Sequence, residues 1–196
     1  AIEDSDKTPE EKLAAVEDLV EKALADLTDQ GRKLSKEESD SIAALISSLP
    51  EGGTKTSLTN ALAAAVYTKT DISNEIEAAT VMADVRELAD RIKNSTLSDA
   101  DKKELNGSLV QHTLDDANGI NIEKAADVKL LSYLIDNSDM TEAEKVTVRQ
   151  KLELKAEVAM VAEINSLTTM NQVRKMTQDI ADSTTLTDAK KKELMM

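Results

Sequence analysis

Residues 85–105 read VRELADRIKNSTLSDADKKEL. Val85, Leu88 and Ile92 are spaced three and four positions apart, which predicts an amphipathic helix with one apolar stripe. After a short polar segment, Ser98 can cap a second helix, and the acidic residues that follow it complement the positive end of a helix dipole. The stretch therefore predicts two helices joined by a short loop.

This pattern returns twice along the chain. It recurs at residues 128–148, VKLLSYLIDNSDMTEAEKVTV, and at residues 173–194, VRKMTQDIADSTTLTDAKKKEL, so that the leading valines are 43 and 45 residues apart. A period of about 44 residues is typical of helical repeats, in which neighbouring pairs must stack to bury their apolar stripes. The sequence predicts stacked helical pairs, and the final helix is short relative to its counterparts.

The N-terminal part carries two further helix starts. Thr8 with Glu11 and Ser35 with Glu38 have the spacing of capping boxes, and residues 50–53, PEGG, form a break after the second helix. We expect a helical hairpin at residues 1–51, which can pack with residues 54–70 as a three-helix bundle, and helical-pair repeats at residues 52–196. The predicted fold is all-α and antiparallel, with about nine helices. Their approximate ranges are 9–30, 35–49, 56–69, 72–94, 98–117, 120–137, 141–166, 169–183 and 187–196.

Composition excludes several classes of protein. The chain has 196 residues, no cysteine, and 38 acidic against 24 basic residues, a formal net charge of −14. Disulfides, thiolate metal sites and cysteine nucleophiles are therefore impossible, and the acidic balance argues against nucleic-acid binding. With no Trp or Phe and only 5 Gly and 2 Pro, a turn-rich β fold is not expected. No run of 18 apolar residues occurs, so we expect no transmembrane helix.

Candidate reactive groups are few. His112 is the single histidine, and it has no second histidine or cysteine with which to bind zinc, so we interpret it as an ordinary or hydrogen-bonded helix residue. Residues 115–121, DDANGIN, resemble a calcium loop, but with Gly119 at the sixth position the first and twelfth positions are not acidic. The recurring acidic first turns are explained by capping. We expect no catalytic, cofactor-binding or metal-binding residue, and no enzyme.

Methionine is unevenly distributed, with six of the seven in residues 140–196. Flexible thioethers can fill a core that lacks aromatic residues, and they also suit adaptable binding surfaces. Core filling is the default interpretation, and Met195 and Met196 are the pair that we place first at an interface. The full set of possible interface residues is Met170, Met176, Leu194, Met195 and Met196.

One passage resembles a known family. Ile164, Asn165, Thr169, Val173, Met176 and Ile180 fit a pattern that is similar to the second-to-third-helix passage of GA-type and FIVAR-like three-helix modules of Gram-positive surface proteins. The helix start at residues 141–145, TEAEK, also resembles those modules. The resemblance implies a cell-wall-attached modular protein that serves as a spacer or host-protein binder. It does not extend to the albumin contacts of such modules, so no functional residue is transferred.

These observations predict a non-catalytic function. The leading hypothesis is an extracellular or cell-surface structural, self-assembling or protein-binding module, in which helix faces contact a protein partner or another copy. A sharper form has residues 187–196 pack against the N-terminal helix of the next subunit, as a head-to-tail homo-oligomer. The alternative is a regulatory or chaperone-like protein with a Met-lined groove for partner helices. The chain begins at Ala1 and not at Met, so either a signal peptide was removed or the sequence is a piece cut from a longer chain. An acidic, cysteine-free helical chain with few aromatic residues suits a secreted or cell-surface protein, and we expect that location.

Overall fold

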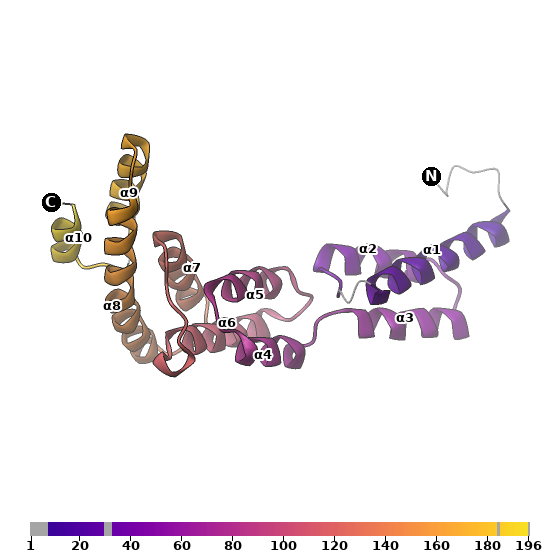
Figure 1. Ribbon diagram of the computed structural model, residues 1–196. Coiled ribbons are helices and arrows are strands. Elements are labelled where there is room, and N and C mark those ends of the chain that lie inside the picture. The colour runs from indigo at the N-terminus through magenta and orange to yellow at the C-terminus, as the bar shows by residue number, and fades with distance from the viewer. Residues whose placement is uncertain (1–7, 30–32, 184, 196) are drawn as a thin grey trace. The chain divides into compact units, whose positions relative to one another are not determined.

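The computed structural model describes residues 8–29, 33–183 and 185–195 (Figure 1). The described residues form ten α-helices and one short 3-10 helix, with a single isolated β-bridge between Leu34 and Val66. The predicted all-α class is therefore confirmed. Two compact units divide the chain, one formed by residues 1–68 with 94–97 and the other by residues 69–93 with 98–196.

The first unit is a three-helix arrangement of α1 (Pro9–Asp29), α2 (Lys36–Ser47) and α3 (Gly53–Ala65), each of which contacts the other two (Figure 1). Both expected capping boxes are present. The amide of Thr8 donates to Glu11 at 2.8 Å, and the amide of Ser35 donates to Glu38 at 2.9 Å, each with a bond in return.

Aliphatic side chains fill the core of this first unit. They come from all three helices and from the segments that flank α2. The buried set is Val20, Leu24, Leu27, Leu34, Ile42, Ile46, Leu49, Leu58 and Leu62. Because no aromatic ring contributes, the core depends on many small aliphatic contacts, each buried methylene stabilising by about 0.8 kcal/mol.

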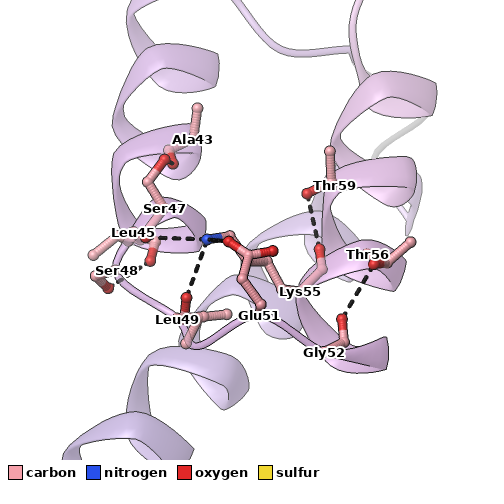
Figure 2. Close-up of polar contacts among 10 residues, drawn as sticks. All are labelled: Ala43, Leu45, Ser47, Ser48, Leu49, Glu51, Gly52, Lys55, Thr56 and Thr59. Carbon is pink, nitrogen blue, oxygen red and sulfur yellow. Dashed lines mark hydrogen bonds and ion pairs between the residues drawn. The ribbon is translucent and has the colours of Figure 1, made fainter.

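A lysine closes the connection between α2 and α3. Figure 2 shows the side chain of Lys55 reaching back from the first turn of α3 to the end of α2. Its Nζ donates to the carbonyl oxygens of Leu49 at 3.1 Å and Ser47 at 3.4 Å, and it pairs with Glu51 at 2.8 Å. The last carbonyls of a helix have no partner within the helix, so a cation placed here both satisfies them and complements the helix dipole.

The second unit contains the three predicted helical pairs. Each pair is two helices joined by a loop of a few residues, as the repeated sequence indicates. The pairs are α5 (Met82–Asn94) with α6 (Asp99–Leu114), α7 (Ala125–Asp136) with α8 (Glu142–Ser166), and α9 (Met170–Asp182) with α10 (Asp188–Leu194). α4 (Lys69–Ala78) precedes them and packs against α6, and the 3-10 helix η1 (Asp116–Asn118) follows α6.

Two kinds of hydrogen bond recur at the loops of the helical pairs. The second helix of each pair is capped by a hydroxyl, supplied by Ser98, Thr141 or Thr187, which accepts from the amide three residues later. In the first and third pairs, a lysine of the second helix also donates to a carbonyl at the end of the first helix. Lys102 donates to the oxygen of Lys93 at 3.1 Å, and Lys191 to that of Ala181 at 3.0 Å. These bonds hold each hairpin closed.

A third kind of hydrogen bond, from backbone amides to a side chain, occurs at the start of the first helix of each pair. The side chain of Asp84 accepts from the amides of Thr80 and Val81, at 3.0 and 3.2 Å. At the same repeat position, Asp127 accepts from the amides of residues 123 and 124, and Gln172 from those of residues 168 and 169. A side chain in the first turn therefore satisfies the amides that precede each helix.

The prediction of one helix over residues 72–94 is wrong, because residues 79–81 are not helical and separate α4 from α5. The amide of Ala79 donates to Ile76 in a turn, and its carbonyl receives a bond of 2.9 Å from Nε2 of His112 on α6. Asp84 then starts the next helix. The expected helix over 120–137 begins at Ala125 instead, after a turn in which Gly119 has a φ of 65°. The described helices are consequently ten rather than nine.

Candidate protein interface

An exposed apolar stripe lies on α8. Leu154, Val158 and Val161 are spaced four and three residues apart, which places them on one face of the helix. Leu154 and Val158 are each 70 % exposed and Val161 is also exposed. Apolar side chains that lie singly on a surface need no explanation, but three aligned along one helix face indicate a contact surface.

The opposite face of the same helix is in the core. Val148, Leu152, Ala156, Ala159 and Met160 are buried, and α8 contacts both α7 and α6. α8 therefore carries two apolar faces, one packed and one open. Sequence reasoning missed the open face, although a second set of apolar residues out of phase with Leu152 and Ala156 was the available signal.

The first half of α9 is also exposed. Met170 and Val173, three residues apart, are 66 % and 40 % exposed, whereas Met176 and Ile180 further along the helix are buried. The apolar stripe of α9 is thus covered over its second half alone. We treat the α8 stripe, defined as Leu154, Val158 and Val161, and the α9 pair, defined as Met170 and Val173, as two separate surface features.

The structure separates the interface residues predicted from sequence. Met170 and Met195 are exposed and Leu194 is half-buried, so these three are accessible. Met176 is buried, and its assignment to an exposed surface needs correction, because it fills the core of the unit as a flexible apolar side chain. Met196 lies outside the described residues.

The remaining described methionines belong to the core. Met82, Met140 and Met160 are buried, as core filling predicts. They therefore do not line an open groove, and the structure offers no support from these side chains for a Met-lined site for partner helices.

Polar contacts attach α10 to α8. Lys190 pairs with Glu157 at 2.5 Å, and the amide of Thr187 donates to Glu153 at 3.0 Å. The hydrogen bonds that Lys190 donates to Glu157 and, to a smaller extent, to Glu193 raise the pKa of Lys190. Because both side chains remain in contact with water, the ion pair is screened and stabilises the fold little. An ion pair thus forms part of the contact between the second and third helical pairs.

The first and second pairs meet more closely. Nδ2 of Asn106 on α6 donates to the carbonyl of Asn137 at 3.0 Å, and the amide of Asp139 donates to the carbonyl of Lys103 at 3.3 Å. Gly107 lies between these residues and is buried. At the same repeat position α8 has Gln150, which is exposed.

Groups considered for catalysis or metal binding have structural partners. Nε2 of His112 bonds the carbonyl of Ala79, and its Nδ1 lies 3.2 Å from the amide nitrogen of Asn118, so both ring nitrogens are engaged. Asp115 accepts from the amide of Ala117, and Asp116 pairs with Lys155 at 2.8 Å. Among the residues that the structure describes, no group of three acidic or histidine side chains could hold a metal ion.

Acidic residues of the first turns act as caps. The hydroxyl of Ser98 donates a hydrogen bond to Asp101, and this bond is the largest single cause that lowers the pKa of Asp101, ahead of the hydrogen bond from Lys69. Hydrogen bonds from the side chain and backbone of Thr141 likewise lower the pKa of Glu144. Both carboxyl groups are held in the ionised form, which suits a cap beside a helix N-terminus.

Comparison with known proteins adds no further assignment. No protein-family model, curated protein or solved structure matches this chain. No helix formed by the described residues is long and apolar enough to cross a membrane.

Proposed function

We propose that this chain is a non-catalytic helical-repeat module that acts by contact, holding a protein partner or another copy of itself on the C-terminal unit. The observation that carries the proposal is the α8 stripe. Its three aliphatic side chains stay in water on a helix whose other face is fully packed. Burying them against a partner would release about 25 cal/mol for each Å² of apolar surface covered.

The arrangement of polar groups supports the same function. His112 bonds the carbonyl of Ala79 between two helices, the acidic first turns cap helices, and the repeated hydrogen bonds fix the geometry of each hairpin. A stack of such hairpins presents rigid helix faces, which is how repeat proteins bind partners. The acidic, cysteine-free composition is our basis for placing the module outside the cell or at its surface.

A comparison of stabilities tests whether the side chains of the α8 stripe lie outside the core of the chain. The double variant Leu154→Ser, Val158→Ser should change the free energy of unfolding by no more than about 0.5 kcal/mol, because both side chains are exposed. The buried Leu152→Ala in the same helix should cost about 2–5 kcal/mol. If the double variant is as unstable as Leu152→Ala, the stripe belongs to the core and the proposal fails.

A single-cysteine label tests whether the stripe makes contacts. The chain has no cysteine, so Val158→Cys can carry one environment-sensitive fluorophore, with Val146→Cys as a matched control. Val146 is an exposed aliphatic residue of the same helix that lies off the stripe. On concentration of the protein, a blue shift at position 158 alone supports self-assembly. Turnover of a substrate, abolished by one polar substitution at a distant site, would contradict the proposal.

A further inference from the structure

A hollow between the first two helical pairs is lined by more basic than acidic side chains. It lies where α5, α6 and α7 meet and has a volume of about 530 Å³, within the range of about 300–1,000 Å³ that is usual for ligand sites. Three buried aliphatic residues contribute to its lining: Ala89, Ile92 and Leu134. Its basic residues are Lys93, Lys102 and Lys103, and we call it the lysine hollow.

In the described part of the chain, the lysines of this hollow form no ion pair. Nζ of Lys102 donates to the carbonyl of Lys93 at 3.1 Å, and Lys103 is exposed. Asp90 and Asp99 also line the hollow and are exposed, so the lining carries three positive and two negative charges. Charges more than about 8 Å away are largely screened at physiological ionic strength. The hollow therefore favours an anion locally, although the chain has a net charge of −14.

A neighbouring hollow, which shares Tyr133 with the first, has charged groups that already have partners. It is lined by α7, α8 and α9 and has a volume of about 270 Å³. The partners are Lys129 with Asp179, Arg149 with Asp136, and Gln178 with Asp182. Packing between helical pairs thus brings opposite charges together in the smaller hollow, and it does not do so for the lysines of the larger one.

The repeated scaffold does not require two of these lysines. At the spacing of 43 residues that relates the first two pairs, Lys93 corresponds to Asp136 and Lys103 to Val146. By contrast, a lysine stands at the position of Lys102 in all three pairs, as expected of a residue that closes the hairpin. Since neighbouring repeats share the side chains that build the stack, Lys93 and Lys103 are additions to it at one hollow.

An exposed aromatic ring lies beside the lysines. Tyr133 on α7 lines the hollow and is 53 % exposed, in a chain that has two tyrosines and no Trp or Phe. The corresponding residue of the first pair is Asp90, so the repeat does not require the ring either. Tyrosines placed in this way are enriched among the residues that dominate binding energy at protein interfaces. A ring and aliphatic lining next to ammonium groups suit a carboxylate that is flanked by aliphatic side chains.

We propose that the lysine hollow binds an acidic segment of a partner protein, in which a glutamate or aspartate is flanked by aliphatic side chains. The carboxylate accepts from the ammonium groups of Lys93 and Lys103, and the aliphatic side chains cover Tyr133 and the apolar lining. A second copy that docked through the same hollow would bring two sets of lysines together, because an isologous contact joins identical surfaces. The inference goes beyond the proposed function, since it concerns α5, α6 and α7 and no residue of the α8 stripe.

A peptide titration of the full chain tests the hollow. The probe is the fluorescent peptide Leu-Glu-Leu-Glu-Leu, and its control is the same peptide with lysine in place of each glutamate. By fluorescence anisotropy we expect saturable binding of the probe, at least about tenfold tighter than that of the control, a difference of about 1.4 kcal/mol. The variant Lys93→Glu, Lys103→Glu should weaken binding of the probe by at least about tenfold, and Tyr133→Ser should weaken it as well.

A matched variant separates the hollow from the total charge of the chain. Lys175→Glu, Lys192→Glu makes the same change in net charge at two exposed lysines outside the hollow, and it should leave binding unchanged. Leu154→Ser, Val158→Ser should also bind the probe as the wild type does. Because all the substituted residues are exposed, the variants should fold, and circular dichroism with urea denaturation checks this for each.

Each of the other outcomes overturns the inference. These are no saturable binding at about 1 mM probe, equal binding of the lysine peptide, or an equal loss in Lys175→Glu, Lys192→Glu. Octanoate that displaces the probe at an equal concentration makes a free carboxylate the occupant. Self-association of the chain that is abolished by Lys93→Glu, Lys103→Glu makes the occupant a second copy. Binding that is lost in Leu154→Ser, Val158→Ser but kept in Lys93→Glu, Lys103→Glu overturns the inference and leaves the proposed function of the α8 stripe intact.

Discussion

The guanidinium of Arg86 on α5 donates two hydrogen bonds to Oδ1 of Asp127 on α7, at 2.9 Å from Nε and 2.7 Å from Nη2. The other oxygen, Oδ2, accepts from the amides of Glu123 and Lys124, at 3.2 and 3.1 Å. Asp127 is 1 % exposed, and a carboxylate so placed is tolerated when its lone pairs are used. One side chain thereby starts α7 and ties the second helical pair to the first.

Removing this carboxylate should be costly. We expect Asp127→Ala to lower the free energy of unfolding by about 3 kcal/mol, since it leaves two amides and part of the guanidinium without their acceptor. Asp84→Ala is the matched control, because Asp84 makes the same amide bonds in the first pair without such burial, and it should cost about 1 kcal/mol. Urea denaturation followed by circular dichroism measures both. Equal losses would show that the burial of Asp127 contributes nothing.

Gly107 permits the close contact between α6 and the loop of the second pair. A Cβ atom at this position would lie 3.0 Å from Oδ1 of Asp139 and 3.7 Å from Cβ of Ser138. We expect Gly107→Gln, which introduces the residue found at position 150, to lower the free energy of unfolding by about 2 kcal/mol. At Gly53 an added Cβ meets nothing within 4 Å, so Gly53→Gln should change it by no more than about 0.5 kcal/mol. A neutral Gly107→Gln would show that the loop moves away freely.

The helical pairs were predictable because their signals are local. Ser98, Thr141 and Thr187 each cap a helix, and the spacing of apolar residues before them sets the preceding stripe. The break at Ala79 was missed. The amide bonds of Asp84 are local and could have indicated a helix start, but the bond to Ala79 comes from His112, which lies 33 residues away. Contacts of this kind come from the packing of α6, which no local pattern describes.

The candidate interface was predicted less well. Met170 and Met176 lie on one helix with the same side chain, but the first is exposed and the second buried. α9 contacts both α7 and α10, and how far these contacts extend along it depends on tertiary packing and not on residue type. Leu154 and Val158 were missed because α8 is apolar on both sides, so a single stripe does not describe it.

Lys55 should stabilise the fold through the hydrogen bonds that it donates to carbonyl groups at the end of α2. Lys55→Met keeps most of the apolar stem but removes the bonds to Ser47 and Leu49 together with the ion pair to Glu51, and we expect it to lower the free energy of unfolding by about 1 kcal/mol. Glu51→Gln removes the ion pair alone, and this exposed pair should be worth less than about 0.5 kcal/mol. Thermal and urea denaturation compare the two. A larger effect of Glu51→Gln would assign the stabilisation to the ion pair.

The lowered pKa of Glu144 predicts that the stability of the fold depends on pH. Hydrogen bonds from Thr141 lower its pKa in the folded chain, so its ionised form stabilises the fold at a pH above the ordinary glutamic acid pKa of about 4.3. That stabilisation is lost as the pH falls through this value to the lower pKa of the folded state. Glu144→Gln keeps a side chain that can accept from the amide of Thr141 but does not titrate. The wild type should therefore be more stable than Glu144→Gln at pH 7, and the gap should close as the pH approaches 3.

A reciprocal variant checks the pH effect on the same motif. In α9 the capping box of Thr169 naturally contains Gln172, whose oxygen accepts from the amide of Thr169 at 3.0 Å. Gln172→Glu adds a carboxylate at this helix start, so it should stabilise the chain at pH 7 and lose that advantage at pH 3. Urea midpoints of the wild type, Glu144→Gln and Gln172→Glu at both pH values distinguish the contribution of each capping residue from the general effect of acid on stability. A gap between wild type and Glu144→Gln that is the same at pH 7 and pH 3 would exclude the charge of Glu144 as the cause.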